Sequence, residues 1–149
     1  MTIKHIERWH RVARPEPTER DFDVQLGCHL EEVAEMIADL KFHHPEFGVT
    51  FGTATGAYNT LVAMANMLKR GETTATIKDR ENFLKELCDQ VVTATGVAYC
   101  AGMNMPEALE VVDRSNFSKF GPDGKPVRDA NGKIMKSIHY VKPDLTGLY

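Results

Sequence analysis

The sequence predicts an all-α protein, a bundle of four to five helices followed by a small C-terminal β-hairpin and an irregular tail. Three observations lead to this fold class. Apolar residues recur in steps of three and four through most of the first 120 residues, which is the spacing of a buried helix face. Polar cap residues, prolines and glycines separate these stretches as helix boundaries do. Two strong turn signals follow after residue 120, so extended structure is expected near the C-terminus.

The first two helices have clear boundaries. Residues 3–13 form an amphipathic stretch that Pro15 ends, because proline cannot continue a helix. Thr18 is a good N-cap for the second helix. The apolar stripe of this helix alternates steps of four and three and runs to about Phe42. Residues 43–55 contain proline and glycine and are expected to form an ordered loop.

Three further helices are expected. One spans about residues 55–70, and a glycine follows its last residue as in many helix C-caps. The longest spans about residues 78–102, and its apolar stripe, which includes Leu84 and Val91, is expected to be buried in the core. The last, residues 105–117, has Asn104 or Met105 as its cap and a proline in its first turn.

The C-terminal part of the chain has a different character. The motifs Gly-Pro-Asp-Gly at 121–124 and Asp-Ala-Asn-Gly at 129–132 predict turns. Short apolar segments flank the second motif, which favours a small hairpin. A length of 149 residues fits one domain. We expect a single domain over 1–149, with a helical core at 1–120 and the hairpin and tail at 121–149.

Composition narrows the class of protein. The chain is 42% apolar and 26% charged, with a net charge of −3, which is typical of a soluble globular protein and argues against a nucleic-acid-binding surface. No stretch approaches the ~20 apolar residues that span a bilayer, and the N-terminus lacks the apolar run of a signal peptide. The cysteines Cys28, Cys88 and Cys100 lack CxxC spacing and are expected to be reduced, buried thiols. We therefore expect a cytoplasmic protein without a membrane partner.

Two pairs of acidic residues carry most of the functional signal. Glu32 and Glu35 are three apart on the second helix, as are Glu86 and Asp89 on the fourth. Side chains at this spacing share a helix face with Cβ atoms about 5–6 Å apart, where like charges repel. Apolar residues expected to be buried flank both pairs, so a cation is needed to neutralise them. Hard carboxylate oxygens suit Mg²⁺ or Mn²⁺, and these ions often hold substrate phosphates.

Other interpretations of the acidic residues were considered. Glutamates are common on solvated helix faces, and either pair alone is most simply explained in that way. A di-iron bundle needs Glu-x-x-His on two helices, whereas only Glu7 and His10 fit that pattern. Zinc is poorly supported because Cys and His do not occur at ligand spacing on a shared helix.

The two acidic motifs, Glu-Glu-x-x-Glu at 31–35 and Glu-x-x-Asp at 86–89, resemble those of the all-α nucleoside triphosphate pyrophosphohydrolases, the MazG-like family. Relatives in this family include dimeric dUTPases and phosphoribosyl-ATP pyrophosphohydrolase. Residues 110–120, with Ser-Asn-x-Ser-Lys at 115–119, resemble the segment that closes the family's catalytic helices, and residues 132–144 are similar to the tail of several bacterial and phage-encoded members. The connection between the two acidic motifs is longer than is usual in the family.

The resemblance implies a reaction and a set of residues. Glu32, Glu35, Glu86 and Asp89 would coordinate Mg²⁺, with Mn²⁺ as a possible substitute, and Glu31 would act on the attacking water or support the ligands. Water would attack the α-phosphorus of a nucleoside or deoxynucleoside triphosphate and release pyrophosphate. The family resemblance also implies a homodimer or homotetramer, in the host cytoplasm for a phage-encoded member.

Several residues are candidates for binding the substrate. Lys119, with Asn116 three residues before it, would hold the leaving phosphates. Lys133 and Lys136 would reach the substrate if the hairpin folds over the site, although plain solvent exposure explains these two lysines equally well. Tyr140 or Trp9 would stack on the base, although core packing is the simpler explanation for each of these aromatic residues. Two alternative functions stay open. One is a substrate-restricted relative such as a dUTPase or a phosphoribosyl-ATP pyrophosphohydrolase, and the other is a non-catalytic helical module that binds nucleotides or a partner protein.

Overall fold

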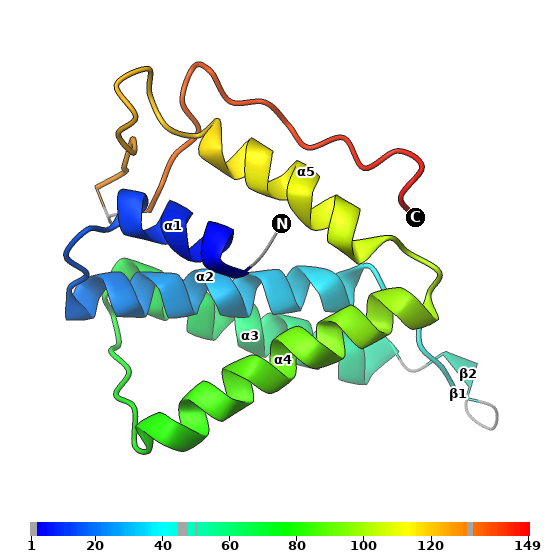
Figure 1. The fold of residues 1–149 in the computed structure, drawn as a ribbon. Helices are drawn as coiled ribbons and strands as arrows, with labels where there is room; N and C mark the ends of the chain where they lie inside the picture. The colour runs from blue at the N-terminus through cyan, green and yellow to red at the C-terminus, as the bar shows by residue number, and fades with distance from the viewer. Residues whose placement is uncertain (1–2, 45–47, 50, 131–132) are drawn as a thin grey trace. The chain divides into compact units, whose positions relative to one another are not determined.

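The computed structural model describes residues 3–44, 48–49, 51–130 and 133–149 (Figure 1). Its fold is all-α, as the sequence predicts, apart from one pair of two-residue strands. Over the described residues the elements are α1 (Ile3–Ala13), α2 (Glu19–Ala38), β1 (His43–His44), β2 (Gly48–Val49), α3 (Phe51–Arg70), α4 (Arg80–Cys100) and α5 (Met105–Phe117).

Most of the helix starts lie where the cap residues predict them. Thr18 caps α2 through a capping box, because its hydroxyl accepts from the Asp21 amide while the Asp21 carboxylate accepts from the Thr18 amide, each at 3.1 Å. Asp79 caps α4, and Asn104 caps α5. Local side chain–backbone hydrogen bonds therefore set these starts.

Two boundaries differ from the prediction. Helix α2 ends at Ala38, not near Phe42, and α3 begins at Phe51 inside the segment that was expected to be a loop. Within that segment β1 and β2 pair antiparallel, with His43 opposite Val49. Proline and glycine signals mark a change of direction, but a short strand pair can provide that change as well as a loop can.

The chain forms two compact units, and each is described here by itself. The first consists of Met1–Glu16, Thr76–Asp129 and Ile134–Tyr149, so it holds α1, α4 and α5. The second consists of Pro17–Ala75 and Ala130–Lys133, so it holds α2, α3 and the strand pair. That the two units make one domain stays a prediction.

Helices α2 and α3 lie side by side and form the core of the second unit (Figure 1). Their buried residues are small or aliphatic, with Val24 and Ala34 from α2 and Ala65 and Leu68 from α3. The helices approach closely at Gly27, where a Cβ atom would lie only 2.8 Å from the Ala65 carbonyl oxygen. The missing side chain of this glycine is thus a condition of the close packing.

In the first unit His5 and Trp9 connect α1 to α5 and to the residues directly after it. The His5 ring nitrogen Nδ1 lies 2.8 Å from Oδ2 of Asp113, a carboxylate only 8% exposed. The indole N–H of Trp9 donates to the Asn116 carbonyl at 2.8 Å. The Trp9 ring also stacks on Phe120, with ring centroids 5.3 Å apart. Trp9 is therefore used in the core of its unit.

The C-terminal tail returns along α5 (Figure 1). Near the end of α5, the Ser115 hydroxyl donates to the Val141 carbonyl and the Val141 amide donates to the Ser118 hydroxyl. At the start of α5, the Asn104 amide donates to the Leu148 carbonyl at 2.8 Å. These contacts fasten the tail to both ends of the helix.

The sequence predicts a hairpin in the C-terminal segment, but the residues that the structure describes there do not form paired strands. The described residues of that segment form isolated antiparallel bridges, Phe120 with Pro126 and Arg128 with Ile134. The second bridge flanks the predicted turn at 129–132, and residues 131–132 of that turn lie outside the described residues. Single bridges form where the chain pairs for only one residue before it twists away.

Helix α4 is more exposed than its apolar stripe predicts. Leu84 is 63% and Val91 is 51% exposed, although both were expected in the core. None of the three cysteines forms a disulfide, but Cys88 and Cys100 are exposed, so the prediction of buried thiols is wrong for these two. Periodicity shows that a helix has an apolar face, but it does not show which neighbour covers that face.

Over the part of the chain that the structure describes, no helix is both long and apolar enough to cross a membrane.

Candidate functional site

The first acidic motif lies on the regular helix α2. Glu32 and Glu35 are exposed one turn apart on this helix, as the spacing requires. Glu31 is half-buried, with its carboxylate 2.5 Å from the Lys69 ammonium and 3.5 Å from the Lys133 ammonium. The hydrogen bond from Lys69 is the main cause that holds the pKa of Glu31 below its ordinary value; partial burial opposes it, and the charge of Lys133 adds to it.

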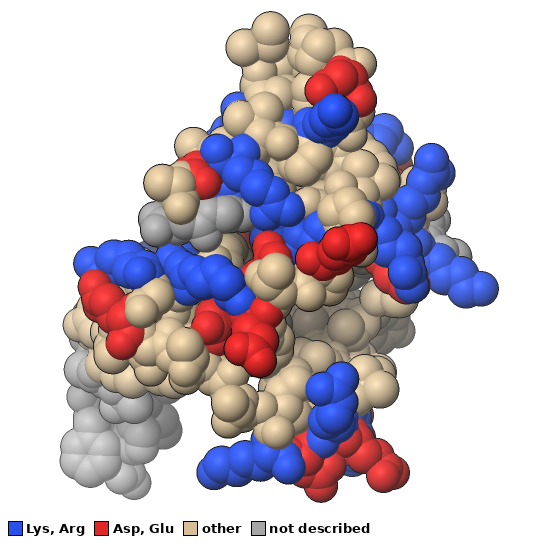
Figure 2. All heavy atoms as spheres, turned by 90° about the vertical axis from the view of Figure 1, so that its left-hand side faces the viewer, with Lys and Arg blue, Asp and Glu red and all other residues tan. Residues whose placement is uncertain are grey.

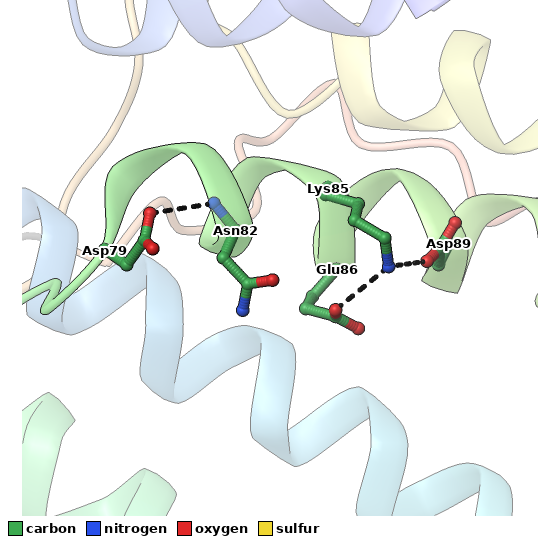
Figure 3. Close-up of polar contacts among 5 residues, drawn as sticks. All are labelled: Asp79, Asn82, Lys85, Glu86 and Asp89. Atoms are coloured by element: carbon green, nitrogen blue, oxygen red, sulfur yellow. Dashed lines mark hydrogen bonds and ion pairs between the residues drawn. The ribbon is translucent and has the colours of Figure 1, made fainter.

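The second acidic motif lies on α4, and Figure 3 shows how its side chains meet. The Lys85 ammonium stands between the two acids, 3.1 Å from Glu86 and 2.7 Å from Asp89. The hydrogen bond with Asp89 is the main cause that raises the pKa of Lys85 above its ordinary value, with Glu86 contributing next. The carboxylates of this pair thus reach one shared cation.

Because apolar residues flank both acidic pairs, the pairs were expected to be partly buried, but neither pair is. The side chains of Glu86 and Asp89 are 53% and 54% exposed, and Glu32 and Glu35 are exposed as well. Water therefore screens the repulsion within each pair, and Lys85 also relieves the repulsion between Glu86 and Asp89. Solvent exposure also leaves the carboxylate oxygens accessible to an ion from solution.

The two pairs belong to different units, because α2 lies in the second and α4 in the first. Within the described residues, no group of three or more Asp, Glu, His or Cys side chains stands in a metal-binding arrangement. The convergence of Glu32, Glu35, Glu86 and Asp89 into one centre stays a prediction.

Four candidate substrate-binding residues lie in the first unit, namely Asn116, Lys119, Lys136 and Tyr140. Asn116 and Lys119 are half-buried at the end of α5, and the Lys119 amide donates to the Asn116 carbonyl. The tail carries Lys136 and Tyr140, with the ammonium 4.6 Å from the centre of the ring in a cation–π contact. The hydrogen bond from the Ser137 hydroxyl to the Ser118 carbonyl, 2.9 Å long, holds this part of the tail against the same end of α5. The structure thus gathers the segments that carry these residues.

Two lysines near the acidic residues, Lys85 and Lys69, were not singled out from the sequence. Lys85 lies beside Glu86 and four residues before Asp89, a spacing from which its contacts are predictable. Lys69 is far from Glu31 in the chain, so the sequence holds no local signal for their contact. On the face drawn in Figure 2, basic side chains stand beside acidic ones.

A second polar cluster lies between α1 and α5. His5, Glu110, Asp113 and Arg114 line an open cavity of about 220 Å³. The contact of His5 with the buried Asp113 joins the two helices. Asp113 lies 108 residues from His5 in the chain, so the sequence holds no local signal for this contact.

Comparisons of the chain with protein-family models, with curated proteins and with solved structures found no match.

Proposed function

We propose that this protein is a Mg²⁺-dependent nucleoside triphosphate pyrophosphohydrolase. It cleaves a nucleoside or deoxynucleoside triphosphate between the α and β phosphates and releases the monophosphate and pyrophosphate. The proposal includes a helix bundle of the MazG-like type with a small C-terminal hairpin, assembly as a homodimer or homotetramer, and a cytoplasmic location. It rests on the resemblance of the two acidic motifs and on the geometry of their side chains.

One observation carries the proposal furthest. The carboxylates of Glu86 and Asp89 approach a single cation within hydrogen-bonding distance, which at present is the Lys85 ammonium. Two carboxylates that meet at one positive charge are a suitable donor set for a hard divalent ion. Glu32 and Glu35 have the same spacing on α2 and are equally open to solvent.

In this mechanism Glu32, Glu35, Glu86 and Asp89 would hold Mg²⁺ or Mn²⁺. The bound ions would neutralise the triphosphate and make a water molecule more acidic. Glu31 would accept a proton from the attacking water or support the neighbouring carboxylates. Lys119 and Asn116 would hold the leaving phosphates, with Lys136 and Tyr140 on the tail. Positioning and electrostatics would supply most of the acceleration, as in other phosphoryl transfers.

The direct test is pyrophosphate release from a panel of nucleoside and deoxynucleoside triphosphates, with and without Mg²⁺. We expect release that EDTA abolishes and that Glu35→Gln and Asp89→Asn each reduce by about 10²-fold or more. Glu81→Gln is a matched control, because Glu81 is an exposed acid on α4 outside the motif. Activity that survives EDTA, or that is unchanged in both variants, would overturn the metal mechanism.

The same panel separates the alternatives. Turnover of a single nucleotide would indicate a substrate-restricted relative, of the dUTPase or phosphoribosyl-ATP pyrophosphohydrolase kind. Binding without turnover of any nucleotide would indicate a non-catalytic helical module. The exposed acids disfavour this module, because clustered negative charge repels triphosphates unless a cation joins them.

A further inference from the structure

Every serine of the chain takes part in one network of hydrogen bonds, where the C-terminal tail passes the end of α5. The chain has three serines. Ser115 lies in the last turn of α5, Ser118 is the C-cap of that helix, and Ser137 lies on the tail. Each of them makes a hydrogen bond that joins the end of the helix to the tail. We call these three residues the serine clamp.

Ser118 is the centre of the serine clamp. Its hydroxyl donates to the Ser115 carbonyl at 2.6 Å and accepts the Val141 amide at 2.8 Å. Its backbone carbonyl accepts the Ser137 hydroxyl at 2.9 Å. A hydroxyl has only one hydrogen to donate, so these two bonds together fix the direction of the Ser118 side chain.

The serine clamp binds both backbone groups of Val141. The amide of this residue donates to the Ser118 hydroxyl, and its carbonyl accepts the Ser115 hydroxyl at 2.7 Å. The two serines are three positions apart, so they lie on the same side of the helix end. A tail that slipped along α5 would lose both bonds at once, because both are made to the same residue. The serine clamp therefore fixes the position of the tail along the helix.

The candidate substrate-binding residues are chain neighbours of the residues in this network. Asn116 and Lys119 directly follow the two serines at the end of α5. On the tail, Lys136 directly precedes the third serine, and Tyr140 directly precedes Val141. The Lys136 ammonium lies 4.6 Å from the centre of the Tyr140 ring, so the tail brings a positive charge and an aromatic ring together. Lysine is a common ligand of phosphate groups, and an aromatic ring can stack on a base.

We propose that the serine clamp positions Lys136 and Tyr140 on the tail beside Asn116 and Lys119 at the end of α5, so that the four residues form one binding surface for a nucleoside triphosphate. The serine hydroxyls bond to backbone groups, so they act on the substrate only through the residues that they hold in place. The motif Ser-Asn-x-Ser-Lys then has two tasks, since its serines attach the tail while its other polar residues bind the nucleotide. This inference rests on the proposed pyrophosphohydrolase function and deepens it.

The first test is the kinetics of pyrophosphate release in Ser118→Ala. We expect KM to rise about tenfold, the size of one lost contact to a charged group. We expect kcat to change less than about twofold, because the residues on the tail bind substrate and transition state equally. Ser118→Thr keeps the hydroxyl and should restore KM. Thr146→Ala is the matched control, because the Thr146 hydroxyl bonds to Asp144 inside the tail. An unchanged KM, a loss in kcat alone, or a rise in KM that Ser118→Thr does not reverse overturns the inference.

A double variant separates positioning from a general loss of stability. Lys136→Met, which keeps the stem and loses the charge, should by itself raise KM about tenfold. Added to Ser118→Ala it should cause little further rise, because the lysine of a detached tail no longer reaches the substrate. Two additive effects would overturn the inference. Ser137→Ala removes the serine of the tail without changing α5, and it replaces Ser118→Ala in both experiments if that variant does not fold.

A further test does not need turnover. Inorganic triphosphate is added to the full-length protein in EDTA, and the backbone amide signals are followed by NMR. We expect the signals of Lys119, Lys136 and Tyr140 to shift in the native chain. The affinity should fall about tenfold in Ser118→Ala and stay unchanged in Thr146→Ala.

The outcomes of the titration separate the inference from the proposed function. If the native chain shows no shift at Lys119 or Lys136, or if Ser118→Ala binds inorganic triphosphate as tightly as the native chain, the inference is overturned whatever the activity shows. If the native chain releases no pyrophosphate from any nucleotide, the proposed function fails. The titration then still decides whether the serine clamp positions a binding surface for triphosphate.

Discussion

At the scale of single residues, buried polar groups in each unit are matched with specific partners. Asp23, 4% exposed, accepts the Ala75 amide at 2.9 Å, and Ser115, 5% exposed, donates to the Val141 carbonyl at 2.7 Å. A buried polar group that loses its partner costs about 1–3 kcal/mol. These contacts therefore specify where the segment after α3 and the C-terminal tail attach.

His10 should make stability depend on pH. Burial is the main cause that lowers its pKa from the usual 6.5, and the charge of Arg14 adds to this. The unfolded chain then binds more protons than the folded one below about pH 6.5, so stability falls as the pH decreases through that value. We expect His10→Gln to lose less stability than the native chain between about pH 8 and pH 5.5 in urea unfolding. The difference should stay below about 1 kcal/mol, because solvent still reaches the ring. Identical pH dependence in both proteins would contradict this prediction.

At the scale of elements, the contact of α2 with α3 depends on a single small residue. A methyl group at Gly27 would meet the backbone oxygen of Ala65 as well as the Lys69 stem. A lysine stem can move aside, but the carbonyl is part of a helix and cannot shift without separating the two helices. The second unit therefore has little room for any side chain at position 27.

Replacing Gly27 by alanine should destabilise the protein by about 1–3 kcal/mol, the usual cost of overpacking. Gly56 on α3 is the matched control, because nothing lies within 4 Å of a Cβ atom built there. Gly56→Ala should instead stabilise by about 0.5–1 kcal/mol, since alanine is the better helix former. Chemical denaturation of the two variants measures the change in unfolding free energy, which should be a loss for Gly27→Ala and a gain for Gly56→Ala. A stable Gly27→Ala protein would show that the helices are not in tight contact.

At the scale of the whole molecule, the proposed reaction requires acids from both units to act on the same ions. Ligand binding to the folded state raises stability by mass action, so Mg²⁺ should raise the melting temperature. If Glu35 and Asp89 serve one centre, Glu35→Gln and Asp89→Asn should each abolish most of this gain, and the double variant should behave like either single one. The measurement is the melting temperature of each protein in Mg²⁺, compared with its melting temperature in Na⁺ at equal ionic strength. Two independent, additive losses would mean that the pairs bind ions separately.

Local sequence signals were sufficient for most of the secondary structure. The bounds of α1 and the cap residue Thr18 were predicted, and Asn104 was one of the two caps considered for α5, because capping and proline effects act within a few residues. The early end of α2 and the pairing of residues 43–44 with 48–49 were not, since the proline and glycine signals of this segment predict a break in the helix but not its position or the structure that follows. The spacing of the acidic residues on α2 and α4 was also predictable, as it follows from helix geometry alone.

The sequence by itself determined the all-α class and the two helical carboxylate pairs, because both depend on period and spacing along one segment. Only the tertiary structure decided that Lys69 contacts Glu31, that His5 contacts Asp113, and that the tail runs along α5. The first two contacts join residues 38 and 108 positions apart, and the tail contacts with the end of α5 join residues 19 to 26 positions apart. Such pairs are chosen by how whole helices pack, which no local pattern records.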